Sequence, residues 1–533
     1  MQLKRSIGVV GLTFVAVSGV IGSGWLFAPL LTSQLAGPAS VLAWLIGGVA
    51  VLMMALCFAE VSGTLPVAGG IARIPHFTHG DVTSMALGWT AWVGYNTQAP
   101  IETLAMLEYL AIDFPWLFAG SGKGAPLSPA GMLVTLALLA LFVVVNALGA
   151  RALARANGVI TWFKLAIPVV LGLALISSRF EPGNFTSAGF APDGLRGVFA
   201  AVSGGGIIFA FLGFRHAIDL AGEAKNPQTT VPIALVASLL ICLLIYVLLQ
   251  IAFIGALGPV HLENGWSQVS FAHGLGPLAG VALALGIAWL TTTLYVGAVI
   301  GPLGGALVAT GSNARLGYAL SQNKFFPPFF LALSGRGIPV RMLLLNFVVG
   351  ALLVFLMPFD EVVSLNGAAI TLSFCAGPIA VYALRRQLPA HPRRFRLPAV
   401  ALIANTGFLV ATLIVYWSGW HTTWRLGCTL LLGAAIFVVA KRLEGASSAD
   451  LDLRGALWLV PYAIGLGLLS YLGDFSGGRG VIPFGWDIAA AAVLSVGVFH
   501  LASWCRLPAE QTTLYLGEYG DPSGPPPSDD APL

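Results

Sequence analysis

Ser18-Gly19-Val20-Ile21-Gly22-Ser23-Gly24 lies in the middle of the first long apolar run of the chain. Glycine and serine at this density weaken an α-helix, because glycine has no Cβ to restrict its backbone in the unfolded chain. A helix interrupted at bilayer depth leaves N–H and C=O groups that lipid cannot satisfy, so the break must be buried in protein or face a polar cavity. The stretch therefore predicts a broken membrane helix.

A second glycine-rich interruption follows later, where Ser203-Gly204-Gly205-Gly206 runs on to Phe209-Ala210-Phe211-Leu212-Gly213. Two interrupted helices at corresponding points of two halves are a sequence pointer to a transporter's substrate site. If the first helix resumes after Gly22-Ser23-Gly24, its free N–H groups and positive dipole end favour a carboxylate. The alternative is that the glycines only allow helices to pack closely. The paired second break favours a binding site.

The composition excludes a soluble protein. Hydrophobic residues make up 57% of the chain and charged residues 9%, against roughly a quarter charged in soluble domains. Apolar runs of about 20 residues recur, each long enough to cross the bilayer, and the alternating pattern of a β-barrel is missing from the sequence. We predict an all-α polytopic membrane protein with about fourteen spans: 7–33, 39–65, 84–111, 130–149, 157–178, 195–222, 230–256, 278–309, 341–357, 362–384, 398–418, 423–440, 455–473 and 486–505.

The distribution of Lys and Arg predicts the orientation. With the N-terminus in the cytoplasm, all but five of the 26 Lys and Arg residues fall on the cytoplasmic side. This is the positive-inside bias of membrane proteins. The five outside are Lys123, Arg179, Arg196, Arg425 and Arg479. We expect a protein of the cytoplasmic membrane of a prokaryote, with both termini in the cytoplasm.

The densest basic cluster lies in one predicted cytoplasmic loop and has two interpretations. It either determines topology or also contacts anionic lipid, and the first is favoured. Its members are Arg385, Arg386, Arg393, Arg394 and Arg396.

The residues around both breaks, together with three later motifs, resemble the amino acid–polyamine–organocation superfamily of permeases. The later motifs lie at the end of the second span, between the sixth and seventh spans, and after the eighth. The matching residues are Gly22-Ser23-Gly24 with Phe27 and Pro29; Ala59-Glu60 with Pro66 and Gly69-Gly70; Gly222-Glu223-Ala224-Lys225-Asn226-Pro227 with Pro232; and Arg315, Ala319, Pro327 and Pro339.

The resemblance implies a twelve-helix transporter core over residues 1–440. Within it, a five-plus-five inverted repeat (about 7–178 and 195–384) has broken helices 1 and 6. Residues 441–506 then supply two additional transmembrane helices. The Pro-rich, acidic end at 507–533 predicts a disordered cytoplasmic tail.

The resemblance also implies a substrate site between the breaks. The α-carboxylate of an amino acid would bind backbone amides near Ser23 and Gly24, and its α-amino group would meet carbonyls around Val20, Ile21, Phe209 and Leu212. An aromatic residue at the second break can cap the substrate as a gate, for which Phe209 is favoured over Phe211. Gly22 and Ala210 complete the expected substrate-binding set.

Lys164 lies within an otherwise apolar span. A buried ammonium is costly, so such a lysine pairs, snorkels to the interface or titrates. In several members of the superfamily, a fifth-helix lysine lies where sodium-coupled relatives hold a sodium ion. The resemblance therefore implies that Lys164 is a built-in cation whose charge state couples to transport.

Ionisable residues also follow the second break. Arg215 and Asp219 are spaced i,i+4, so one helical face can carry them as an ion pair, and Glu102 is another acid at predicted membrane depth. Mutual neutralisation is one interpretation. In the other, Arg215 binds an acidic substrate side chain bidentately, and His216, with Lys164 and Glu102, takes part in proton coupling.

These observations predict secondary active transport of an amino acid by proton symport with alternating access. The chain resembles the branch that contains aspartate–proton symporters, so aspartate or another acidic amino acid is the expected substrate. An exchanger of amino acids or amines on the same fold is the alternative. The sequence has no Walker loop, no His-Glu-x-x-His and no metal-spaced Cys/His cluster. We therefore expect no enzyme activity, cofactor, bound metal or nucleic-acid partner, and we expect an amino acid, protons and membrane lipid as partners.

Overall fold

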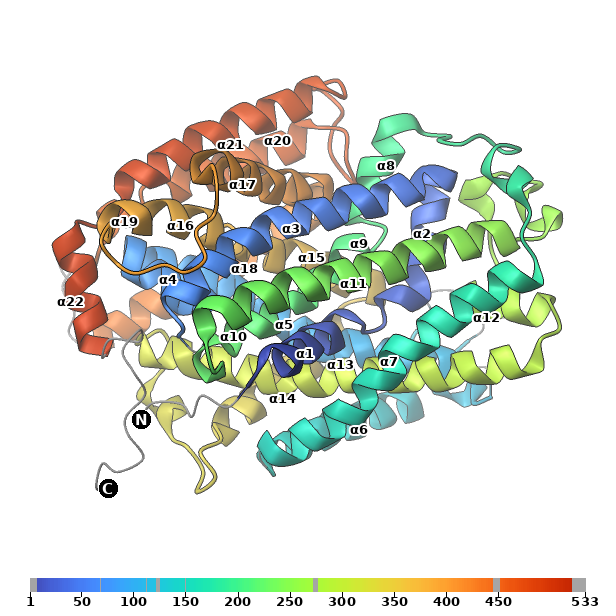
Figure 1. Ribbon diagram of the computed structural model, residues 1–533, viewed down its shortest axis with the longest axis horizontal. Coiled ribbons are helices and arrows are strands. Elements are labelled where there is room, and N and C mark those ends of the chain that lie inside the picture. The colour runs from blue at the N-terminus through green and yellow to red at the C-terminus, as the bar shows by residue number, and fades with distance from the viewer. Residues whose placement is uncertain are drawn as a thin grey trace.

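A computed structural model describes residues 7–67, 69–111, 113–120, 125–148, 150–271, 277–443 and 451–519. Within these ranges the chain is a bundle of long helices whose axes run mostly along one direction (Figure 1). The helices are α1 Val9–Val20, α2 Gly24–Ala36, α3 Ser40–Thr64, α4 Gly70–His79, α5 Asp81–Leu110, α6 Pro129–Ala147, α7 Ala150–Ser178, α8 Gly194–Ser203, α9 Ile207–Phe211, α10 Arg215–Asp219, α11 Pro227–Ala256, α12 Pro277–Ala284, α13 Ala288–Gln322, α14 Val340–Leu356, α15 Phe359–Ser373, α16 Ala376–Gln387, α17 Val400–Trp417, α18 Trp420–Leu443, α19 Leu453–Ala456, α20 Leu459–Leu472, α21 Trp486–Cys505 and α22 Ala509–Tyr519.

The all-α polytopic fold is confirmed. In the part of the chain that the structure describes, ten helices are long and apolar enough to cross a membrane, or eleven if the bent pair α8 and α9–α10 is one span. Each of the fourteen predicted ranges contains helix, although the count of fourteen spans stays a prediction. The single span expected at 278–309 is wrong in detail, because α12 and α13 are separate helices. Between them Gly286 has φ +69°, a conformation that glycine adopts without the strain a side chain would add.

The first helix lies at the centre of the bundle. α1 packs against α11, α7, α13 and α10, and against the short 3₁₀ turn Leu212–Phe214 (η4). Around this centre, α5 packs along α13 and α15, and α3 packs along α11. The break after α1 is therefore enclosed by protein on every side, as the lack of backbone partners in lipid requires.

A buried carboxylate, Glu60, holds the end of α3 to α16 and to the loop that follows it. Its two oxygens accept from Arg385 at 2.8 and 2.6 Å, and Oε2 also accepts from the Leu397 amide at 2.6 Å. Arg393 lies 3.5 Å from Oε1. Two arginines of the basic cluster thus have a structural role inside the protein that neither interpretation of that cluster anticipated.

The last helices pack on one flank of the bundle. α20 and α21 lie beside α17, and α22 lies near α4 and α19 at one end of the molecule (Figure 1). Tyr515 of α22 stacks on His76 of α4 at 4.4 Å between ring centroids, and its hydroxyl donates to Asp452 at 2.7 Å. Disorder predicted from residue 507 is therefore wrong for α22, because packing on α4 orders it; residues 520–533 lie outside the described residues.

Candidate functional site

The first break lies between α1 and α2. Helical hydrogen bonding ends where the Ile21 amide bonds the Val17 carbonyl at 2.8 Å, and it resumes where the Leu26 amide bonds the Ser23 carbonyl at 2.9 Å. The Gly22 amide bonds the Val20 carbonyl at 3.0 Å, whereas the amides of Ser23, Gly24 and Trp25 have no backbone acceptor among the described residues, as expected at a helix start. Since they also carry the positive end of the helix dipole, this start can bind an anion. We call the backbone of Gly22, Ser23 and Gly24 the cradle.

The second break occurs at Gly204–Gly206, between α8 and α9, where the axis bends by 43°. Gly206 has φ +85°, which only glycine adopts without strain. Beyond it, Phe209, Ala210 and Phe211 lie in the short helix α9, and Leu212 begins η4. The glycine run therefore separates α8 from α9, but the following residues up to Leu212 form tight helical turns.

The two broken segments meet. A Cβ added at Gly213 would collide with the Gly19 backbone, and one added at Gly24 would lie 2.8 Å from the Ala210 Cβ. The hydroxyl of Tyr246, on α11, lies between them and shares its one O–H between the Val20 carbonyl at 2.8 Å and the Ala210 carbonyl at 3.1 Å. One side chain thus bonds a backbone carbonyl from each break.

Lys164 is buried beside the first break. Its Nζ donates to the Ser18 carbonyl at 2.6 Å, near the point where α1 runs out of helical partners. A Cβ at Gly304 of α13 would lie 3.1 Å from that Nζ, so the glycine leaves room for the ammonium. The side chain therefore points inward to the break, and the snorkelling alternative does not describe it.

Glu102 faces the same break from α5. It is 1% exposed, and its carboxylate lies beside the hydroxyl and amide of Ser23, with Gln98 and the charge of Lys164 nearby. A Cβ at Gly22 would collide with its Oε1, whereas one at Gly305 would lie 3.1 Å from its Cδ. Its Oε2 has no hydrogen-bond partner among the described residues. The acid therefore points into the cradle.

Arg215 is fully buried at the start of α10. Its guanidinium lies 3.6 Å over the Tyr95 ring, and its Nη2 donates to Gln98 Oε1. Asp219 accepts from the Tyr95 hydroxyl at 3.0 Å. The Arg215–Asp219 ion pair, which was one of the two interpretations, does not form: no salt bridge joins them in the described chain, and both side chains are engaged with α5. Two guanidinium nitrogens, Nε and Nη1, have no partner among the described residues.

His216 points back to the first helix. Its ring lies against Gly19, where an added Cβ would collide with it, and its Nδ1 lies 2.9 Å from the Ser312 hydroxyl of α13. Its Nε2 has no partner in the described part of the chain. The imidazole thus joins α10 to α13 next to the break.

The two candidate gate residues lie in different surroundings. Phe211 is fully buried and packs on Trp44 and Tyr246, with ring centroids 5.8 and 5.3 Å apart. Phe209 is partly exposed, and its ring lies 3.5 Å from the position of a Cβ at Gly24. Only Phe209 therefore borders the cradle, which is the position that a gate requires.

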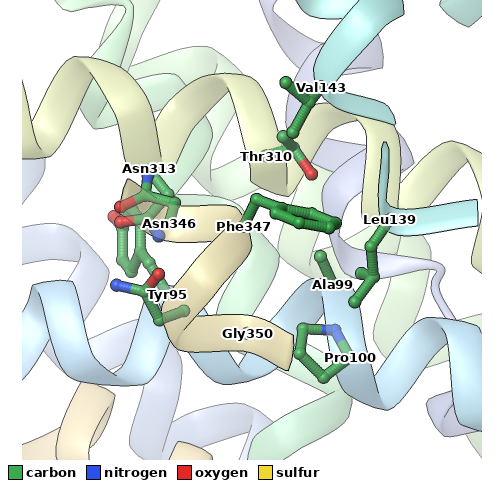
Figure 2. A pocket seen from close by; sticks show the side chains of 11 residues that line it. Tyr95, Ala99, Pro100, Leu139, Val143, Thr310, Asn313, Asn346, Phe347 and Gly350 are labelled. Atoms are coloured by element: carbon green, nitrogen blue, oxygen red, sulfur yellow. The ribbon is translucent and has the colours of Figure 1, made fainter. Parts of the chain in front are cut away.

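A small pocket borders the charged cluster on one side. Figure 2 shows Asn313 and Asn346 at its polar end beside Tyr95, with Phe347 and Leu139 toward its apolar end. None of the predicted site residues lines this pocket, which lies between α5, α6, α13 and α14. The pocket therefore shares only Tyr95 with the residues around Arg215.

Sequence reasoning assigned no role to Tyr246 or Gln98. Tyr246 is the one tyrosine in the apolar helix α11, so its presence there was the available signal. Gln98 stands four residues before Glu102 and therefore on the same helical face. The partners of both residues are distant in sequence.

The sequence model described as amino acid permease matches residues 7–440. The glutamate/serine transporter AimA of Bacillus subtilis (strain 168) is 35% identical over 519 residues, which cover 96% of this chain and 95% of the relative. The aspartate-proton symporter of the same organism is 33% identical, with 95% and 98% covered. The branched-chain amino acid permease BcaP, also of Bacillus subtilis, is 27% identical; the match covers 83% of this chain and 94% of the relative.

Proposed function

The chain belongs to the amino acid permease family, and from this premise we propose that it imports an acidic amino acid together with a proton across the bacterial plasma membrane. Membership and amino acid transport bear out the resemblance seen in the sequence. The substrate, the coupling ion and the direction are the proposed part. We also propose that both termini are cytoplasmic, as the Lys and Arg distribution favours, and that residues 1–440 form the core, whose end coincides with the end of the family match.

The observation that carries the choice of substrate is the buried guanidinium of Arg215. It stands directly after the second broken segment, with Nε and Nη1 unpaired among the described residues. An unpaired buried donor costs free energy until a partner arrives. A carboxylate takes two such N–H groups bidentately, so an acidic side chain supplies the missing acceptor. Two relatives whose names include glutamate or aspartate support this choice.

The zwitterionic head of the substrate would lie between the two breaks. We place its carboxylate on the amides of Ser23 and Gly24. The carbonyls of Val20 and Ala210 already accept from Tyr246. Ile21, in contrast, has a carbonyl that receives no hydrogen bond from the described residues, so we assign it to the ammonium group.

The remaining members of the predicted set have other roles around this place. Phe209 would cover the substrate as the gate. Gly22 and Leu212 shape the backbone of the two segments, and Phe211 supports α9 from behind through Trp44 and Tyr246.

We further propose that Lys164, Glu102 and His216 provide proton coupling. All three are buried and lie against the first break. An ionisable group at this depth is costly and marks a functional position. Since Lys164 already supplies a cation beside Ser18, the arrangement favours protons over sodium as the coupling ion.

A binding screen followed by transport tests the proposal. In a thermal-shift screen of all amino acids and common polyamines, specific binding raises the unfolding temperature by mass action. A shift with acidic amino acids supports the role of Arg215, and a shift with cationic ones alone overturns it. In proteoliposomes, a proton gradient should then drive accumulation. Labelled efflux that requires external substrate would instead assign the exchanger function.

A further inference from the structure

The carboxylate of Glu102 occupies the place where the substrate carboxylate should bind. Its Oε1 fills the space that a side chain at Gly22 would take, and the hydroxyl and amide of Ser23 lie beside it. The proposed function assigns the substrate's own carboxylate to the amides of Ser23 and Gly24, so this carboxylate competes with Glu102 for the Ser23 amide. Two anions cannot share this amide, because like charges at this separation in a low-dielectric interior repel strongly.

Glycines on two elements leave room for this arrangement. Gly22 before α2 and Gly305 on α13 both face the Glu102 carboxyl, and Gly304 faces the Lys164 ammonium. At Gly22, an added methyl group would meet Oε1 at less than van der Waals contact, so the acid would have to leave the cradle. Because these positions are glycines, a space remains between the elements, and the Glu102 carboxyl fills it.

The acid is held by its charge and is not locked in place. Its Oε2 has no hydrogen-bond partner among the described residues. Around it stand Ser23 at the start of α2, Gln98 on its own helix, Lys164 on α7 and Tyr246 on α11. Only Lys164 among these neighbours is ordinarily charged at neutral pH. Removing the negative charge from Glu102 therefore removes most of what draws it into the cradle.

We infer that Glu102 is an internal occupant of the cradle, and that a bound amino acid takes its place only once the carboxyl is protonated; this inference rests on the proposed function. A proton from the medium forms an O–H bond on a Glu102 oxygen, and no other bond changes. The substrate carboxylate then becomes the anion that faces Ser23 and Lys164. When the substrate leaves, Glu102 loses its proton and returns to the cradle.

Competition of this kind predicts a definite pH dependence of binding. Above the pH at which Glu102 ionises in the empty protein, each bound amino acid must bring one proton. Linkage of one proton weakens the apparent affinity by at most about tenfold per pH unit. The full-length protein should therefore bind L-aspartate more tightly as pH falls from 8 to 5, and take up about one proton per bound molecule in weakly buffered solution.

The test compares the wild type with Glu102→Gln and with Glu108→Gln as a matched control on the same helix. Glu102→Gln should bind L-aspartate at every pH as tightly as the wild type does at pH 5, without proton uptake, whereas Glu108→Gln should behave as the wild type. A folded Glu102→Gln protein that keeps the pH slope, or that no longer binds, overturns the inference. So does wild-type binding without proton uptake.

A second variant serves where Glu102→Gln does not fold. Glu102→Asp keeps the charge but draws it back from the cradle by one methylene, so it should bind more tightly than the wild type at pH 8; equal affinity refutes the inference. If L-aspartate does not bind at all, the substrate proposal fails separately. The same comparison is then made with whichever amino acid the thermal-shift screen identifies, because the cradle holds the carboxylate that all of them share.

Discussion

Replacing Tyr246 by Phe removes the hydroxyl that joins the two broken segments. The Val20 and Ala210 carbonyls lose bonds of 2.8 and 3.1 Å. The ring keeps its packing on Trp44, with centroids 4.8 Å apart, so no cavity forms. Interhelical hydrogen bonds in membrane proteins contribute about 0.6 kcal/mol on average and at most about 1.7 kcal/mol. Because the single O–H is shared between the two carbonyls, its removal predicts a loss of about 1 kcal/mol in the free energy of unfolding.

The transport effect separates a positioning role from a purely structural one. When the two halves of the site are held less firmly, part of the binding free energy is used to order them. A loss of about 1 kcal/mol in binding free energy should weaken substrate affinity about fivefold. The matched control is Tyr462→Phe on α20, one of the additional helices. It removes a buried hydroxyl that lies 3.0 Å from the Thr412 hydroxyl of α17. Denaturant titration and uptake are measured on both. Tyr246→Phe with wild-type stability and affinity, or equal uptake losses in both variants, would refute this reasoning.

Three further predictions concern charge. Arg215→Gln should weaken binding of acidic amino acids by about 10- to 100-fold in competition assays, since a hydrogen bond to a charged group contributes about 1.5–3 kcal/mol, and should spare neutral ones. Glu60→Gln leaves the Arg385 guanidinium without its anion, so denaturant titration should show a loss of about 3–5 kcal/mol. His79, in α4 outside the spanning helices, has its pKa lowered to about 4 by burial. Because the unfolded chain binds its proton first, stability is complete above pH 6.5 and falls by up to about 3 kcal/mol toward pH 4; His79→Gln should remove this part of the acid sensitivity in unfolding curves.

Local chemistry located the weak points of both helices. Glycine density placed the first break at Gly22-Ser23-Gly24, and the structure interrupts the helix between Val20 and Gly24. The second break is centred on Gly206, where a left-handed φ stops α8. Phe209 to Leu212 nevertheless remains helical, because tight turns satisfy this backbone while Tyr246 bonds the Ala210 carbonyl. Propensity indicates where a helix is weak, but tertiary hydrogen bonds decide how far it unwinds.

Partners across the bundle were not predictable from one sequence. The i,i+4 spacing of Arg215 and Asp219 suggested a mutual ion pair, yet Tyr95 takes a contact with each of them. Lys164 finds a carbonyl 146 residues away. The Tyr515 contacts that order α22 likewise depend on His76 and Asp452. Each of these outcomes depends on which helices lie side by side, and apolar spans in sequence do not specify their neighbours.

The charges around the two breaks give a reason for an acidic substrate to travel with one proton. Lys164 and Arg215 balance Glu102 and Asp219 when all four carry their ordinary charges and His216 is neutral. A buried site far from neutrality is costly, since each uncompensated charge pays a large desolvation penalty. Protonating Glu102 leaves one positive charge in excess, and an amino acid with net charge −1 cancels it. A zwitterionic amino acid would leave that charge uncompensated.

Transport currents should therefore be smaller per molecule for L-aspartate than for L-serine at equal proton stoichiometry, because one proton and one aspartate carry no net charge. Equal currents per molecule would contradict the charge count.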